Sequence, residues 1–180
     1  MSPPSPSTAL PEGVRLGRHR GEGTRSGRIT SVVSFVILGT FLGAGLLGLL
    51  GGQPNPVTSQ DFGPATLTVR APTILRNGVF FEMELEVRAD EVMSDVVIGI
   101  DSGLWRNVTI NTTIPAPAEE SFRDGAYMLN FGPLAAGDRL LVKIDGQINP
   151  PMFAGTHGNI ALFDRDRQLG ALPLSITVLP

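Results

Sequence analysis

The sequence predicts an all-β protein, an antiparallel β-sandwich of about eight strands that follows one transmembrane helix and a disordered N-terminal tail. Three observations lead to this fold class. Apolar and polar residues alternate with a period of two in short segments of residues 64–180, turn-forming residues separate these segments, and the one long apolar segment carries no charge. The chain then divides into a tail (1–28), a helix (29–51), a linker (52–63) and the sandwich (64–180).

The tail is basic and the predicted sandwich is acidic. Residues 1–28 carry five arginines and two glutamates, a net charge of +3, whereas residues 53–180 carry nine cationic and fifteen anionic residues, a net charge of −6. The tail is also rich in Pro, Ser and Gly and has few large apolar residues, so we expect it to be disordered. The two ends of the chain therefore face different surroundings.

The apolar segment has the length of a membrane span. The 22 residues from Ile29 to Leu50 are mostly Ile, Val, Phe, Leu, Ala and Gly. At about 1.5 Å per residue they form a helix of roughly 33 Å, enough for a hydrocarbon core of about 30 Å. A cleaved signal peptide is one alternative, but its apolar region is shorter, about 7 to 15 residues. A buried core helix is the other, but a soluble helix of this length normally shows a polar face. Because the arginines precede the span, we expect a single-pass protein of the cell membrane with its N-terminus in the cytoplasm and its C-terminal domain outside.

Gly39 and Gly43 form a G-x-x-x-G pattern inside this segment. Small residues four apart lie on one helix face and let two helices approach closely in a bilayer. The pattern predicts that this helix packs against the same helix of a second copy, which forms a homodimer, or against a helix of a partner protein. The alternative is that a glycine-rich membrane helix contains the spacing by chance.

The clearest strand is VFFEMELEVR, whose Phe81, Met83, Leu85 and Val87 alternate with Glu82, Glu84, Glu86 and Arg88. Seven further segments alternate in the same way: ATLTVRA, SDVVIGID, RNVTINTTIP, AYMLNF, DRLLVKID, NIALFD and LPLSITVLP. Turn formers such as Asn77-Gly78 and Asp124-Gly125 separate them, and no amphipathic helix lies between them, which argues against a helical enzyme core. Short strands at this spacing are typical of an immunoglobulin-like sandwich, although the absence of cysteine removes the disulfide of antibody domains.

Two turn motifs carry a resemblance to a known group of proteins. Asn77-Gly78 enters the long second strand, and GPLAAGDRLLVKIDGQINP places a Gly-Asp turn before another strand. Through these two turns, residues 64–180 resemble the immunoglobulin-like, adhesion-type sandwiches found outside the cytoplasm in bacterial single-pass membrane proteins. The resemblance implies a binding or spacing module of a bacterial protein and brings no catalytic residue with it.

The side chains that could support catalysis or bind a cofactor are few. His157 is the only histidine outside the tail, so a multi-histidine zinc site is excluded, and no G-x-S-x-G turn offers a nucleophile. A hydrolase that uses His157 is the alternative. Asp164 and Asp166 alternate with arginines in a hairpin and lack the pattern of a calcium loop. We therefore expect neither enzymatic activity, nor a cofactor, nor a metal.

Other patterns argue for ordinary surface roles. Glu82, Glu84 and Glu86 line the wet face of a strand, an environment that does not separate a general acid from a general base. No basic surface with interleaved aromatic residues supports nucleic acid binding. Asn107 and Asn111 begin N-x-T sequons, which a eukaryotic secretory pathway could glycosylate and which are plain strand residues in a bacterium.

Two loops are the candidate contact surface for a protein partner. One contains Leu104, Trp105 and Arg106, and the other contains Pro150, Pro151, Met152 and Phe153. A tryptophan beside an arginine is the kind of pair that anchors interfaces, and aromatic or methionine side chains on rigid turns can do the same. The alternative is that Trp105 and Phe153 fold back onto the core. If each predicted strand crosses the sandwich once, the two loops lie at opposite ends of it.

These features predict a membrane-anchored, extracytoplasmic binding or accessory module without catalysis. Its partners are the lipid bilayer and a membrane or cell-envelope protein, and not nucleic acid. The alternative function is a structural or spacer protein of the cell envelope, in which the sandwich binds no partner of its own.

Overall fold

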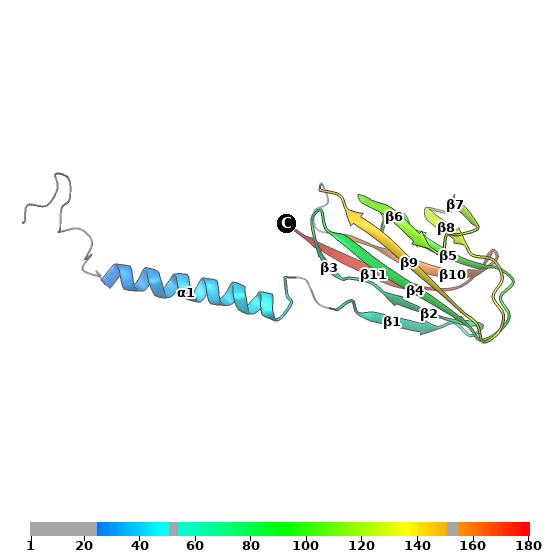
Figure 1. The fold of residues 1–180 in the computed structure, drawn as a ribbon, viewed down its shortest axis with the longest axis horizontal. Helices are drawn as coiled ribbons and strands as arrows, with labels where there is room; N and C mark the ends of the chain where they lie inside the picture. Colours follow the sequence, from blue (N-terminus) through cyan, green and yellow to red (C-terminus); the bar gives the residue numbers. More distant parts are fainter. Residues whose placement is uncertain (1–24, 51–53, 151–154) are drawn as a thin grey trace, which may run out of the picture. The chain divides into compact units, whose positions relative to one another are not determined.

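A computed structural model describes residues 25–50, 54–150 and 155–180. These residues form one helix and eleven strands, which Figure 1 labels: α1 (Arg25–Leu46), β1 (Val57–Asp61), β2 (Ala65–Arg70), β3 (Ile74–Arg76), β4 (Phe80–Ala89), β5 (Val96–Asp101), β6 (Val108–Ile114), β7 (Glu119–Arg123), β8 (Ala126–Asn130), β9 (Arg139–Ile148), β10 (Thr156–Asp164) and β11 (Arg167–Leu179). The fold is therefore mostly β, as the sequence predicts.

The helix α1 is apolar around its whole circumference. Phe35, Val36, Ile37 and Leu38 are four successive exposed positions, and at about 3.6 residues per turn they point in all directions. A Cβ placed on Gly39 or Gly43 would meet no atom within 4 Å, so their predicted role in helix packing stays a prediction. Among the helices that the structure describes, none meets the combined length and apolarity required of a bilayer span.

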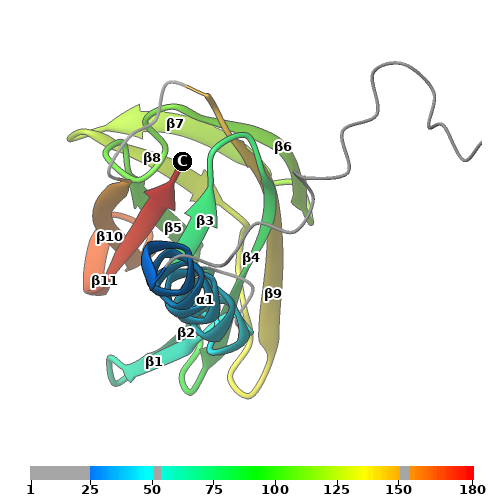
Figure 2. The ribbon, with the colours of Figure 1, turned by 90° about the vertical axis from the view of Figure 1, so that its left-hand side faces the viewer.

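The strands form two sheets. One has the order β1-β2-β4-β9-β6, and the other has the order β3-β11-β10-β5-β8-β7. The view along the strands in Figure 2 shows the two sheets facing each other. All pairs are antiparallel except β3 with β11, which is parallel. This exception arises because the chain changes sheets at Pro72: β2 ends at Arg70 in the first sheet, and β3 begins at Ile74 at the edge of the second.

The strand order is that of an immunoglobulin-like domain. The sequence β2-β4-β9-β6 corresponds to the ABED sheet of the constant type, and β5-β10-β11 corresponds to its CFG sheet. The hairpin β7–β8 is inserted in the chain between β6 and β9 and extends the second sheet beyond β5. Strands β1 and β3 are further additions at sheet edges.

The main core lies between the sheets. Leu67, Leu85 and Val142 contribute to it from the first sheet, and Ile98 and Ile160 contribute to it from the second. All five side chains are fully or almost fully buried. In β4 the burial alternates from Met83 to Val87, because successive side chains of a strand point to opposite faces. The predicted separation of this strand into an apolar inner face and a carboxylate outer face is confirmed.

The structure has eleven strands in its described part, where the sequence predicts about eight. Each of the eight predicted segments is a strand, and the additional three are β1, β3 and β7. All three lie at sheet edges. Residues 57–61, assigned to the linker 52–63 from the sequence, form β1 and pair with β2. These three strands bury little, so they lack the apolar alternation on which the predicted count depends.

The two candidate loops lie at the same end of the sandwich, which corrects the prediction of opposite ends. The Thr156 hydroxyl donates a hydrogen bond to the Gly103 carbonyl oxygen. The Asn149 N–H donates another to the Asn107 carbonyl oxygen, with a distance of 2.9 Å. The cause is β7, because this additional strand lies in the chain between the two loops and reverses the direction in which the following strands run.

Candidate functional site

A groove runs along one side of the sandwich, between an edge of the five-stranded sheet and an edge of the six-stranded sheet. It has a volume of about 460 Å³ and lies between β6, the residues that follow it, and the hairpin β7–β8. Its apolar lining consists of Trp105, Val108, Ile110, Ala116, Pro117, Tyr127 and Leu129, and its polar lining consists of Asn111, Thr112, Thr113 and Glu120. Aromatic rings beside short polar side chains give a surface that offers both apolar contact and hydrogen bonds.

The turn after β5 brings Trp105 to this groove. Leu104 is 3% exposed and belongs to the main core, and its N–H donates to the Asp101 carbonyl oxygen at 2.9 Å. With Leu104 held inside, Trp105 is left half-buried at the rim, where it packs against the core on one side. Of the residues predicted at this contact surface, Leu104 is therefore a core residue, and Trp105 and the exposed Arg106 reach the surface.

Three aromatic rings form a row that starts at Trp105. The ring centroids of Trp105 and Tyr127 are 5.1 Å apart with an interplanar angle of 37°. Those of Tyr127 and Phe122 are also 5.1 Å apart, in an edge-to-face arrangement at 64°. Such pairs contribute about 0.5 to 1.5 kcal/mol beyond the area that they bury. Tyr127 is 40% exposed and Phe122 is 61% exposed, so the row becomes more accessible as it leaves the core.

The second predicted loop is only partly described. Pro150 is exposed and lies next to Asn149, whose side-chain oxygen accepts a hydrogen bond from the Thr109 hydroxyl at 3.0 Å. Pro151, Met152 and Phe153 lie outside the described residues. No pattern in the sequence places Tyr127 or Phe122 at a contact surface. The one available signal was that Tyr127 is the only tyrosine of the chain.

A second surface covers the outer face of the six-stranded sheet. Two hollows of about 380 and 500 Å³ share the lining residues Arg123, Met128 and Asp166. Arg123 on β7 and Asp166 in the β10–β11 hairpin form an ion pair at 2.6 Å, and this hydrogen bond raises the pKa of the Arg123 guanidinium. Val97 and Met128 are buried here, although both point away from the core.

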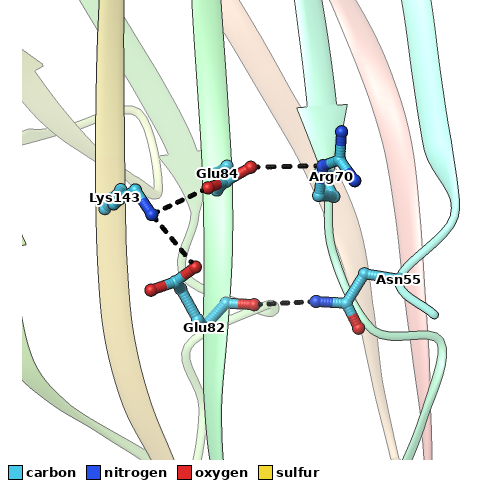
Figure 3. A network of polar contacts seen from close by, with 5 residues as sticks. All are labelled: Asn55, Arg70, Glu82, Glu84 and Lys143. Atoms are coloured by element: carbon cyan, nitrogen blue, oxygen red, sulfur yellow. Dashed lines mark hydrogen bonds and ion pairs between the residues drawn. The ribbon is translucent and has the colours of Figure 1, made fainter.

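Opposite charges line the outer face of the five-stranded sheet. Lys143 on β9 lies 2.9 Å from Glu84 and 3.4 Å from Glu82, and Arg70 on β2 lies 3.2 Å from Glu84 (Figure 3). The hydrogen bond from Lys143 is the main cause that lowers the pKa of Glu84, and the same bond raises the pKa of Lys143. These carboxylates form cross-strand ion pairs, as expected for a wet face.

Side chains that could bind a metal are scattered. Within the ranges 25–50, 54–150 and 155–180, no three His, Cys, Asp or Glu side chains lie close enough to hold an ion. His157 is exposed on β10. The candidate site is thus a partly apolar groove on an immunoglobulin-like domain.

Comparison with known proteins adds structural neighbours only. No protein-family model matches the chain, and no curated protein matches it. A solution structure of the CARDB domain of a Pyrococcus furiosus protein is 12% identical, with a TM-score of 0.41 over 64% of this chain and 94% of that one. A crystal structure of the CARDB domain from the same organism, in complex with di-metal ions, is 10% identical, with a TM-score of 0.39 over 71% of this chain and 90% of that one.

Proposed function

We propose that the chain is a membrane-anchored, non-catalytic binding module whose immunoglobulin-like domain holds a protein partner in the groove beside Trp105. The observation that carries the proposal is the row of rings from Trp105 through Tyr127 to Phe122, which is anchored in the core at one end and exposed at the other. Rings that are already packed lose little conformational freedom on binding, so they suit the centre of an interface.

A protein segment is the occupant that the lining favours. The backbone of β6 forms the free edge of the five-stranded sheet, and its register shifts between Ile110 and Thr112. The hydroxyls of Thr112 and Thr113 and the Asn111 amide supply donors and acceptors beside the apolar rings. An extended peptide needs both kinds of contact, apolar for its side chains and polar for its backbone.

The anchor is the second part of the proposal. It is supported by the uncharged sequence from Ile29 to Gln60 and by the exposed apolar side chains on every side of α1. Five arginines precede this segment, and the next one along the chain is Arg70. We place the N-terminus in the cytoplasm and the sandwich outside it, where the partner is a membrane or cell-envelope protein.

Two neighbouring alanines provide a matched test. Ala116 lines the groove and Ala118 does not, and both are exposed residues outside the strands. The full-length chain is crosslinked in membranes and purified, and the ratio of partner to chain is measured by quantitative mass spectrometry. Ala116→Arg should fill the groove and lower the ratio about tenfold, the equivalent of about 1.4 kcal/mol. Ala118→Arg should leave the ratio unchanged.

Thermal unfolding of both variants separates binding from folding, because each should melt within a few degrees of the wild type. Equal recovery of the partner with Ala116→Arg and with wild type would overturn the groove as the binding site. If no protein is recovered in constant ratio even with the wild type, the spacer function is correct and the binding function is not.

A further inference from the structure

The free edge of the six-stranded sheet, formed by β7, can pair with a strand of another chain. The two sheets have four edge strands in the described part of the chain, β1, β6, β3 and β7. An edge strand presents unpaired backbone N–H and C=O groups and can pair with a strand of another chain. β3 has only three residues, and β6 is interrupted by its register shift, which leaves β1 and β7 as regular edges of five residues.

β7 is the edge that is best suited to a partner. All five of its residues, Glu119 to Arg123, are exposed, and its pairing with β8 has no irregularity. It carries Phe122, whose ring is 61% exposed. An exposed aromatic ring on a regular edge favours strand pairing between chains, whereas β1 has no aromatic residue.

The hairpin turn determines which backbone groups of β7 point outward. Asp124 and Gly125 have φ angles of 54° and 81°, the positive values of a two-residue type I′ turn. In such a hairpin the pair that flanks the turn, Arg123 and Ala126, is hydrogen-bonded, and hydrogen-bonded and non-hydrogen-bonded pairs then alternate. The N–H and C=O groups of Phe122 and Glu120 therefore point away from β8, toward the free edge.

The side chains of β7 alternate between two surfaces. Glu119, Ser121 and Arg123 line a hollow on the outer face of the sheet. Glu120 lines the groove on the opposite side, where Phe122 contacts Tyr127. A strand that pairs with this edge must therefore carry, on the outer face of the sheet, charges opposite to those of Glu119 and Arg123.

We propose that β7 pairs antiparallel with β7 of a second copy of this chain, about a two-fold axis at Ser121. This register joins Glu120 of one copy with Phe122 of the other, so that the outward backbone groups of both residues are satisfied, by about four hydrogen bonds in total. It also places Glu119 of one copy opposite Arg123 of the other, on the same face, and the symmetry repeats this ion pair.

The neighbouring registers fit less well. An axis at Glu120 would place two Glu120 carboxylates opposite each other, and an axis at Phe122 would extend the pairing into the Asp124-Gly125 turn. An axis at Ser121 uses all five residues of β7. The Arg123 guanidinium, which donates to Asp166 at 2.6 Å, is already held on the outer face and has further N–H donors for the Glu119 carboxylate of the second copy. The second copy is therefore the partner that complements this edge.

Cysteine crosslinking of the purified full-length chain tests the proposal. The sequence contains no cysteine, so Ser121→Cys introduces a single thiol. The two Ser121 positions form a non-hydrogen-bonded pair with Cα atoms about 4.5 Å apart, within the range of a disulfide. We expect a disulfide-linked dimer under mild oxidation. Ser59→Cys, on the other regular edge strand β1, is the matched control and should stay monomeric.

Charge reversal then tests the register. Added to Ser121→Cys, either Glu119→Arg or Arg123→Glu should reduce the crosslinked dimer at least about tenfold, because like charges then face each other twice. Mixing the two variant chains should restore crosslinking between them, since every facing pair is again of opposite charge. Ala116→Arg should leave the dimer unchanged, so failure of the groove and failure of this edge are distinguishable.

Two results would overturn the proposal. One is the absence of a dimer with Ser121→Cys under conditions that oxidise the free thiol. The other is a dimer that forms equally with Glu119→Arg, as expected if the copies associate through α1 alone.

Discussion

Replacement of Leu85 by alanine should lower the free energy of unfolding of the sandwich by about 3 to 5 kcal/mol. Leu85 is 0% exposed in β4, the central strand of the five-stranded sheet. Its register neighbours, Val69 on β2 and Val142 on β9, are also buried. A buried Leu→Ala change costs the lost transfer energy together with the energy of the cavity, and strands held on both sides cannot collapse into that cavity.

The assay is urea denaturation of residues 54–180, monitored by the far-ultraviolet circular dichroism signal of the β-sheets. For a domain of this size the expected loss corresponds to a melting temperature lower by about 10 to 20 °C. Glu84→Ala, one residue away on the outer face, is the control and should cost about 1 kcal/mol or less, since ion pairs on a solvent-facing sheet surface contribute little and no cavity forms in the core. Equal costs for the two changes would refute the assignment of inner and outer faces.

Three further predictions concern pH, backbone geometry and topology. Because Lys143 lowers the pKa of Glu84 below its ordinary 4.5, the stability advantage of the wild type over Glu84→Gln should be constant near neutral pH and shrink as the pH falls below 4.5; an advantage that grows in acid would contradict this pairing. Gly155 has a φ of +99° and a Cβ there would lie 2.0 Å from the Ile176 carbonyl oxygen, whereas at Gly63, with a φ of +93°, it would meet nothing, so urea titration should find Gly155→Ala far more destabilising than Gly63→Ala. A reporter that is active only outside the cytoplasm should be active after Pro180 and silent at the N-terminus, and the reverse pattern would exclude the proposed orientation.

The strands with a buried face could be predicted from the sequence, because burial leaves a visible pattern. Met83, Leu85 and Val87 alternate with charged residues, and the structure places them in the core. Three of the four edge strands, β1, β3 and β7, could not be predicted in this way. In β7 the residues EESFR are all exposed, so no alternation marks them as a strand. Their backbone hydrogen bonds to β8 form the strand. Because almost every residue type can make such bonds, the composition of the segment does not reveal them.

The candidate site was predicted in part. The residue type of Trp105 predicts a contact role, and the structure places this side chain at the rim of a groove. Tyr127 and Phe122 were not assigned to the site, because they reach Trp105 only through the β7–β8 hairpin. Leu104, adjacent to Trp105, points into the core, a direction that depends on the turn after β5 and not on the local composition.

Site-specific photocrosslinking in intact cells tests the central claim, that the groove beside Trp105 holds a protein partner. A photoreactive residue replaces Asn111, which lines the groove, or Leu141, which is 45% exposed on β9 and is the control. We expect one crosslinked product of constant mass from position 111, its loss when Ala116→Arg is added, and no product from position 141. The same product from both positions, or a product from position 111 that survives Ala116→Arg, would show that the partner does not lie in this groove.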